Sequence, residues 1–208
     1  THSYSSAASD VYKRQRLIPS IGLKRDSGLS KSKIPEGLWN NCPACDAILY
    51  EPELKKSLYV CPKCDHHLRI GARTRMSIFF DGGGFHELAT KITTKDILNF
   101  KDTKSYGQRI KEAVKSTGEE EAIIVGKGKL EGVEIVVAAF EFRYMGGSMG
   151  GAVGTKFVKG VDEAIASKAP FICFSTSGGA RMQESMVSLM QMAKTSAALE
   201  KLKAAKLP

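Results

Sequence analysis

Four cysteines in two pairs are the residues of this sequence best suited to bind a metal ion. Cys42 and Cys45 form one Cys-x-x-Cys motif, Cys61 and Cys64 form a second, and 15 residues separate the motifs. This is the spacing of a structural zinc site, where each motif makes a turn that offers two thiolates to one ion. Four thiolates complete the tetrahedron that Zn²⁺ prefers and leave no open position for catalysis. We therefore predict one structural Zn²⁺ at these four residues.

Other roles for the cysteines are less well supported by their surroundings. A redox pair of the thioredoxin type would need a βαβ pattern around the motif, which is missing. His66 and His67 could replace a thiolate, but with four cysteines present we expect them at the surface or beside the ligands. Clustered cysteines without an export signal indicate a reducing compartment and metal binding. Cys173 lies in an apolar run, and we expect a buried small hydrophobic residue.

Two glycine-rich turns indicate a second kind of chemistry. Five glycines fall within nine residues from Gly146 to Gly154, and Gly178-Gly179 lies in the run FICFSTSGGARMQES. The glycine pair lacks the Lys-Ser/Thr of a P-loop and the GxSxG spacing of a nucleophile elbow, and neither turn has a GxGxxG fingerprint. All four histidines precede residue 87, so no Ser-His pair is suggested.

What remains at the glycine pair is a strand followed at once by a helix. The unpaired N–H groups and positive dipole end of a helix N-terminus form an anion site. Glycine lets a carbonyl oxygen approach such amides closely, because it has no Cβ. One donor to a developing oxyanion in a water-excluded pocket is worth about 3–4 kcal/mol. A packing turn without a ligand explains the pair equally well, and the residues alone leave both interpretations open.

The elements that must position these turns follow from the hydrophobic pattern. Residues 48–50 and 58–60 are β-rich and are expected to pair as a hairpin between the cysteine motifs. The order strand–strand–helix–strand–helix then implies an α/β domain with right-handed crossovers. The expected helices are 72–80, 105–116, one with apolar spacing at Phe157, Val161 and Ile165, and 181 to about 205; the expected strands are 122–125, 133–142 and 171–174.

The last of these helices carries an apolar stripe at helical spacing. We expect the stripe to be core packing, since methionine fills irregular gaps between helices. Its members are Met182, Met186, Leu189, Met190, Ala193 and Ala197.

Composition and charge bound the remaining possibilities. With 208 residues, 42% of them hydrophobic, the chain can bury a core, and no apolar run is long enough for a membrane span. The net charge is +9, and seven basic residues precede the first cysteine. We expect residues 1–33 to be a disordered basic arm, of which 1–15 are foreign, as a cloning or assembly scar or a transit remnant. Such an arm can attract nucleic acid, although a solvated tail is the simpler interpretation.

Several stretches together resemble the β subunit of the bacterial and plastid acetyl-CoA carboxylase carboxyltransferase. They are 34–39 (IPEGLW), the CPKCDHH that ends the cysteine region, 138–150 (AAFEFRYMGGSMG) and 173–196 (CFSTSGGARMQESMVSLMQMAKTS). The resemblance spans about residues 33–208. It implies a zinc ribbon at 34–70 and, at 71–208, part of a crotonase-like ββα spiral domain.

The resemblance also implies an activity. Family members transfer a carboxyl group from carboxybiotin, held on a separate carrier protein, to acetyl-CoA, and malonyl-CoA for fatty acid synthesis results. The amides of Gly178 and Gly179 would bind the enolate oxygen, and the base would be the released biotin nitrogen. The glycines of the first turn, Gly146, Gly147 and Gly150, would let that loop approach the CoA arm. The residues that could meet CoA phosphates, or be structural or solvated charges, are Arg143, Lys156 and Arg181.

The implied partners are an α subunit in an α2β2 assembly, a biotin carboxyl carrier protein and biotin carboxylase, in an ATP-dependent complex. The location would be the bacterial cytoplasm or the plastid stroma. Family members continue beyond position 208, so we expect this chain to be a fragment that is inactive alone. The alternatives are a zinc-ribbon module that binds nucleic acid through the ribbon and basic arm, and a carboxyltransferase for another acyl-CoA.

Overall fold

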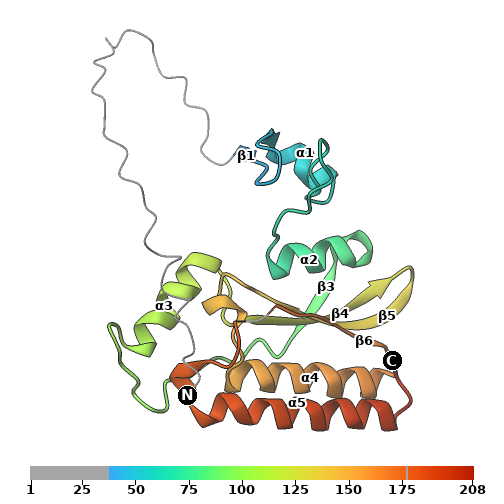
Figure 1. Cartoon of the computed structure of the whole chain (residues 1–208). Coiled ribbons are helices and arrows are strands. Elements are labelled where there is room, and N and C mark those ends of the chain that lie inside the picture. Colours follow the sequence, from blue (N-terminus) through green and yellow to red (C-terminus); the bar gives the residue numbers. More distant parts are fainter. Residues whose placement is uncertain (1–37, 177) are drawn as a thin grey trace, which may run out of the picture. The chain divides into compact units, whose positions relative to one another are not determined.

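The computed structural model describes residues 38–176 and 178–208 (Figure 1). The expected basic arm and the foreign segment 1–15 lie outside the described residues. Within them, two antiparallel strands form a small sheet in the cysteine region, and four strands form the main sheet. No helix of the described part is long and apolar enough to cross a membrane.

The cysteine region pairs differently from the expected hairpin. Strand β2 (Ile48–Tyr50) pairs antiparallel with β1 (Trp39–Asn41), which lies before the first cysteine motif. The chain then enters helix α1 (Glu51–Lys56), whose first turn contains Pro52. Proline suits the first turn of a helix because its missing N–H would be unpaired there. The expected pairing of 48–50 with 58–60 is therefore wrong, and Val60 instead bridges to His67.

The main sheet has the order β3-β4-β5-β6. Strand β4 (Ile123–Leu130) pairs antiparallel with both of its neighbours, β3 (Phe85–Leu88) and β5 (Val133–Phe140), and β6 (Phe171–Phe174) is parallel to β5. The link between β4 and β5 is Glu131-Gly132, with φ angles of 50° and 80°. Two successive left-handed residues match the twist of a tight hairpin, so this link fixes the register.

Helices cover both faces of the main sheet (Figure 1). Helix α2 (Ala72–Phe79) packs on one face, where Met76 meets Ile124 and Val137 in a buried cluster. Helix α4 (Gly151–Ser167) packs on the other face, and α5 (Met186–Ala204) packs on α4. The parallel β5–α4–β6 connection supplies the crossover that the sequence predicts. Short 3-10 turns occupy Asp81–Gly83, Met145–Gly147 and Met182–Glu184.

Helix α3 (Tyr106–Thr117) is confirmed, with each limit one residue later than the predicted 105–116. The Ser105 side chain accepts a hydrogen bond from the N–H of Gln108, and Gly118 ends the helix with φ 74°. An oxygen-bearing N-cap and a left-handed glycine after the last turn are the usual helix boundaries.

The last helix differs from its prediction in two ways. It begins at Met186 rather than at residue 181, because the 3-10 turn at Met182–Glu184 and a left-handed Ser185 intervene. The methionine stripe is not core packing: Met186 and Met190 are 63% and 58% exposed. The buried face of α5 is largely polar and consists of Ser188, Gln191, Thr195, Ala198 and Leu202.

Cys173 also differs from its prediction. It lies in β6, the edge strand of the described sheet, and is exposed rather than buried. Its partner in β5, Ala138, is fully buried. The apolar run around Cys173 identified a strand correctly but gave no information on which strand lies at the edge.

Candidate functional site

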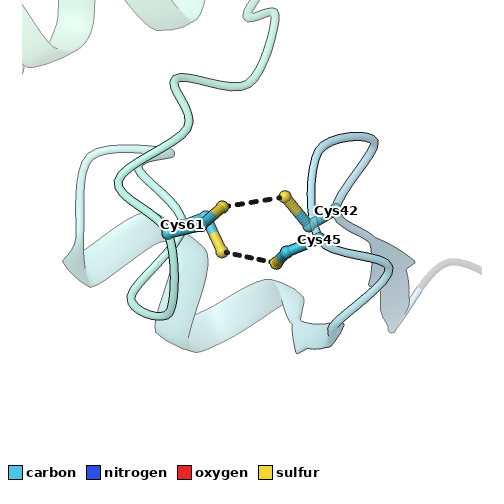
Figure 2. Close-up of side chains that lie close together, drawn as sticks. Cys42, Cys45 and Cys61 are labelled. Carbon is cyan, nitrogen blue, oxygen red and sulfur yellow. Dashed lines mark hydrogen bonds between the residues drawn. The ribbon is translucent and has the colours of Figure 1, made fainter.

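The four cysteines Cys42, Cys45, Cys61 and Cys64 form one cluster, and the first three are labelled in Figure 2. Their sulfur atoms all lie within 4.8 Å of one another. The Sγ–Sγ distances are 3.6 Å from Cys42 to Cys64 and 3.8 Å from Cys45 to Cys61. Tetrahedral Zn²⁺ with bonds of about 2.3 Å separates its sulfur ligands by about 3.8 Å, whereas a disulfide needs about 2.05 Å. The four thiols therefore fit a zinc ion and are not placed as disulfides.

Two matching turns present these thiols. The Cys42 carbonyl accepts from the Asp46 N–H and the Cys61 carbonyl from the Asp65 N–H, each at 2.9 Å. Asp46 and Asp65 both have left-handed φ angles, 54° and 56°. Aspartate tolerates this conformation better than most residues. The repeated geometry shows that each Cys-x-x-Cys motif forms the same turn, so the two halves of the site are alike.

The thiols also interact electrostatically. Burial opposes the thiolate of Cys42, but backbone N–H groups of Ala44 and Cys45 offset it and lower the Cys42 pKa to about 7. At Cys64 the His66 N–H favours the thiolate, yet the neighbouring thiols prevail and raise the pKa to about 12. Like charges this close cannot all form without a cation. A divalent ion among the four sulfurs would remove the conflict.

The two glycine turns lie side by side. Met149 and Ala180 form a parallel bridge, in which the Met149 N–H donates to the Gly179 carbonyl and the Arg181 N–H donates to the Met149 carbonyl, both at 2.8 Å. We call this contact of 146–150 with 178–181 the glycine junction. That the two turns meet could not be predicted from the sequence, because about thirty residues of helix and strand separate them.

The two segments can approach this closely because glycine has no side chain. A Cβ on Gly178 would lie 2.7 Å from the Gly146 carbonyl oxygen, and a Cβ on Gly147 would lie 2.8 Å from the Thr176 side chain. Gly179 has φ 78°, which L-residues other than glycine rarely adopt. These glycines let the two segments contact each other, and their predicted contacts with substrate remain predictions.

The anion site at a helix N-terminus, proposed for Gly178-Gly179 on sequence grounds, is wrong in its detail. Helix α5 begins seven residues after Gly179, at Met186, so its first amides do not adjoin the pair. Because the amides of α5 are too far along the chain, the predicted oxyanion role would have to come from the backbone amides of the two glycines themselves. Both glycines are exposed, which leaves them accessible from solvent.

Two of the cavities that adjoin the glycine junction lie beside the Gly178-Gly179 pair. One, of about 560 Å³, lies beside Gly178 and Ala180 and reaches the polar side chains of α3, including Arg109 and Ser116. The other, of about 300 Å³, lies beside Gly179 and is walled by Phe140 and by methionines. A pocket with a few polar groups next to apolar walls is the usual setting of a ligand site.

The charged candidates differ in accessibility. Arg143 is exposed and pairs with Glu141 at 3.2 Å, so it can still meet a phosphate. Arg181 and Lys156 are 1% and 2% exposed. The Arg181 guanidinium is enclosed by Glu121 and Glu184, and these carboxylates take the place that a phosphate would need. The geometry therefore favours a structural role for Arg181. Neither Arg181 nor Lys156 is accessible enough to bind a CoA phosphate.

Comparison with protein families identifies the class of this fold. Residues 72–208 match the carboxyl transferase domain, which is more than half of the chain, and the chain belongs to this family. Residues 39–64 match the acetyl-CoA carboxylase zinc finger domain. Together the two matches are those of a carboxyltransferase β subunit.

Two solved structures of transcarboxylase 12S support this assignment. One, with methylmalonyl-coenzyme A and methylmalonic acid bound, is 29% identical over 64% of this chain, with a TM-score of 0.54. Another, with hydrolysed methylmalonyl-coenzyme A bound, is 27% identical over 74%, with a TM-score of 0.55. The chain spans 24% and 26% of the length of these relatives. The expected class, a crotonase-like α/β carboxyltransferase fold with a four-cysteine ribbon, is confirmed.

Proposed function

We propose that this protein is the β subunit of an acetyl-CoA carboxylase carboxyltransferase. It would transfer a carboxyl group from carboxybiotin on a carrier protein to acetyl-CoA and so form malonyl-CoA, at the first committed step of fatty acid synthesis. The observation that carries the acetyl-CoA assignment is the match of residues 39–64 to the zinc finger of acetyl-CoA carboxylase, next to the carboxyl transferase domain.

The glycine junction supports the chemistry. Carboxylation requires a carbanion equivalent at the acetyl methyl group, so negative charge develops on the thioester oxygen. Preorganised backbone N–H donors stabilise such charge without reorganisation during the reaction. This role is supported by the exposure of the segment Gly178-Gly179, which is held against Gly146–Met149 and flanked by two cavities that a thioester could enter.

The zinc ribbon does not enter this mechanism. Its four thiols leave no open coordination position, so the ion would stabilise the ribbon rather than polarise the substrate. The proposed partners are an α subunit that binds the biotin carbonyl, the carrier protein and an ATP-dependent biotin carboxylase. The proposed location is the bacterial cytoplasm or the plastid stroma.

A second candidate, a carboxyltransferase for another acyl-CoA, is favoured by one observation. The two transcarboxylase structures similar to this chain hold methylmalonyl-coenzyme A or its hydrolysed form. The acyl group must therefore be tested directly.

The test is carboxyl transfer by the complete β subunit assembled with an α subunit. The assay would supply carboxybiotin and compare acetyl-CoA with propionyl-CoA. We expect a higher kcat/KM for acetyl-CoA. A preference for propionyl-CoA would overturn the acetyl-CoA assignment alone, and failure to carboxylate any acyl-CoA would overturn the carboxyltransferase proposal. Salt-sensitive binding to heparin without binding to immobilised CoA would favour the nucleic-acid alternative.

A further inference from the structure

One buried guanidinium lies between two carboxylates directly behind the glycine junction. The Arg181 Nη2 donates to Glu121 Oε1 at 2.7 Å, and its Nη1 lies 3.5 Å from Glu184 Oε1. All three side chains are at most 5% exposed. Although burial opposes its charge, the attraction of Glu121 raises the pKa of Arg181, so the group stays cationic. The three charges therefore form a fixed structure inside the domain.

Arg181 holds the first glycine segment by its main chain and its side chain. Its N–H donates to the Met149 carbonyl at 2.8 Å. Its Nη2 donates to the Ser148 carbonyl at 3.0 Å, and its Nε donates to the Ser148 hydroxyl at 3.2 Å. One residue of the second segment thus fixes two consecutive residues of the first.

Glu184 binds the backbone directly after the first glycine segment. Its Oε2 accepts from the N–H of Gly151 at 2.6 Å, at the first residue of α4. Its Oε1 accepts from the Tyr106 hydroxyl at 2.6 Å, and the hydroxyl also accepts from Arg181 Nη1 at 3.2 Å. A Cβ on Gly150 would lie 2.7 Å from Glu184 Oε1, which explains the glycine there. Tyr106 therefore connects α3 to both charged residues.

We infer that Arg181, Glu184 and Tyr106 are positioning residues, which fix the amides of Gly178-Gly179 relative to the first glycine segment. This inference rests on the proposed function, because it assigns the network to the oxyanion donors of that reaction. Donors stabilise a transition state only if their orientation is set before the reaction. Since the network bonds to Ser148, Met149 and Gly151, a shift of its charges moves the segment against which Gly178 packs.

A milder change than charge removal is needed to test this role. Truncating Arg181 or Glu184 would leave an unpaired buried charge and could prevent folding. Tyr106→Phe removes one hydroxyl and keeps the ring. Tyr144→Phe is the matched control: Tyr144 is equally buried and its ring lies 5.7 Å from the Arg181 guanidinium, but its hydroxyl has no hydrogen-bond partner among the described residues.

The experiment compares both variants in the assembled carboxyltransferase and in hydrogen exchange of the β subunit. For Tyr106→Phe we expect kcat to fall about threefold to tenfold with the KM for acyl-CoA within about twofold, because only transition-state donors are misplaced. Exchange should quicken in peptides covering 146–151 and 178–184 and stay unchanged across β4 and β5. For Tyr144→Phe we expect neither change.

Three outcomes would overturn the inference. They are an unchanged kcat in Tyr106→Phe, equal effects of the two variants, and faster exchange that extends through β4 and β5, which would show general destabilisation. If the wild-type assembly carboxylates no acyl-CoA, the proposed function fails instead. In that case unchanged exchange at the glycine junction would still overturn the positioning role, and local quickening would support it.

Discussion

Gly178→Ala is the most direct perturbation of the glycine junction. The added methyl carbon would lie 2.7 Å from the Gly146 carbonyl oxygen, 3.0 Å from its carbonyl carbon and 3.3 Å from its Cα. All three are backbone atoms, so no side-chain rotation relieves the contact. Ordinary contact begins at 3.4 Å, and one of the two segments must therefore retreat by about 0.7 Å.

A retreat of this size affects activity more than stability. Overpacking a well-packed contact costs about 1–3 kcal/mol. Misplacement of a reacting group by about 1 Å can cost about 100-fold in rate, and loss of one oxyanion donor costs about 100- to 1,000-fold in kcat. We therefore predict a fall in kcat of about 30- to 100-fold, with zinc content unchanged.

The assay is steady-state carboxyl transfer by the assembled enzyme, combined with thermal unfolding of the β subunit. Gly84→Ala is the control, because Gly84 has an ordinary φ of −91° and no atom would lie within 4 Å of its Cβ. The control should keep wild-type kcat. If Gly178→Ala folds and retains kcat within about threefold, the geometry of the junction does not set the rate and our reasoning is refuted.

Three further predictions concern other features. Gly179→Ala and Gly132→Ala impose the same left-handed strain, because the φ angles are 78° and 80° and the space around each glycine is open. The free energy of unfolding should fall by about 1–2 kcal/mol in both variants. Only Gly179→Ala should lower kcat in the transfer assay. Cys64→Ser, or zinc removal by a chelator, should speed hydrogen exchange throughout the ribbon but not in β4 and β5, since structural zinc supplies much of a small module's folding energy; unchanged exchange in the ribbon would contradict the zinc assignment. Met186→Gln and Met190→Gln should each change the free energy of unfolding of the 208-residue chain by less than about 0.5 kcal/mol, because both side chains are exposed in the structure; denaturant titration showing a loss above 2 kcal/mol would contradict their exposure.

Local signals in the sequence predicted what depends on short spacing. The zinc ligands follow from two Cys-x-x-Cys motifs, and the limits of α3 follow from the hydrophobic pattern to within one residue. The hairpin of the ribbon could not be predicted in the same way. The residues between its two expected strands form helix α1, which has Pro52 in its first turn, and the true partner of β2 lies before the first motif.

The orientation of α5 shows a different limit. Apolar spacing predicts a buried methionine face, but the helix buries polar residues that find partners within the chain. Thr195 Oγ1 donates to the Gln191 carbonyl at 2.9 Å, and Ser188 Oγ donates to the Arg181 carbonyl at 2.5 Å. Because buried polar groups cost little once hydrogen-bonded, hydrophobicity alone does not decide which face packs.

The network behind the junction had no signal in the sequence. Arg181 and Glu121 are 60 residues apart, and no motif connects them. An arginine after a glycine pair is equally compatible with a phosphate contact and with a buried ion pair. Tertiary structure alone distinguishes the two, since it brings the loop before β4 next to the loop after β6.

The Glu184 carboxylate accepts a hydrogen bond from the first residue of α4, and this contact affects whether dissolved anions can bind there. The N-terminus of a helix attracts phosphate and carboxylate from solution, but here a carboxylate of the chain already occupies the Gly151 amide. An incoming anion would have to displace Glu184 and leave the Tyr106 hydroxyl without this acceptor. The end of α4 thus carries its own counter-anion, and phosphate buffer should not inhibit the enzyme by binding there.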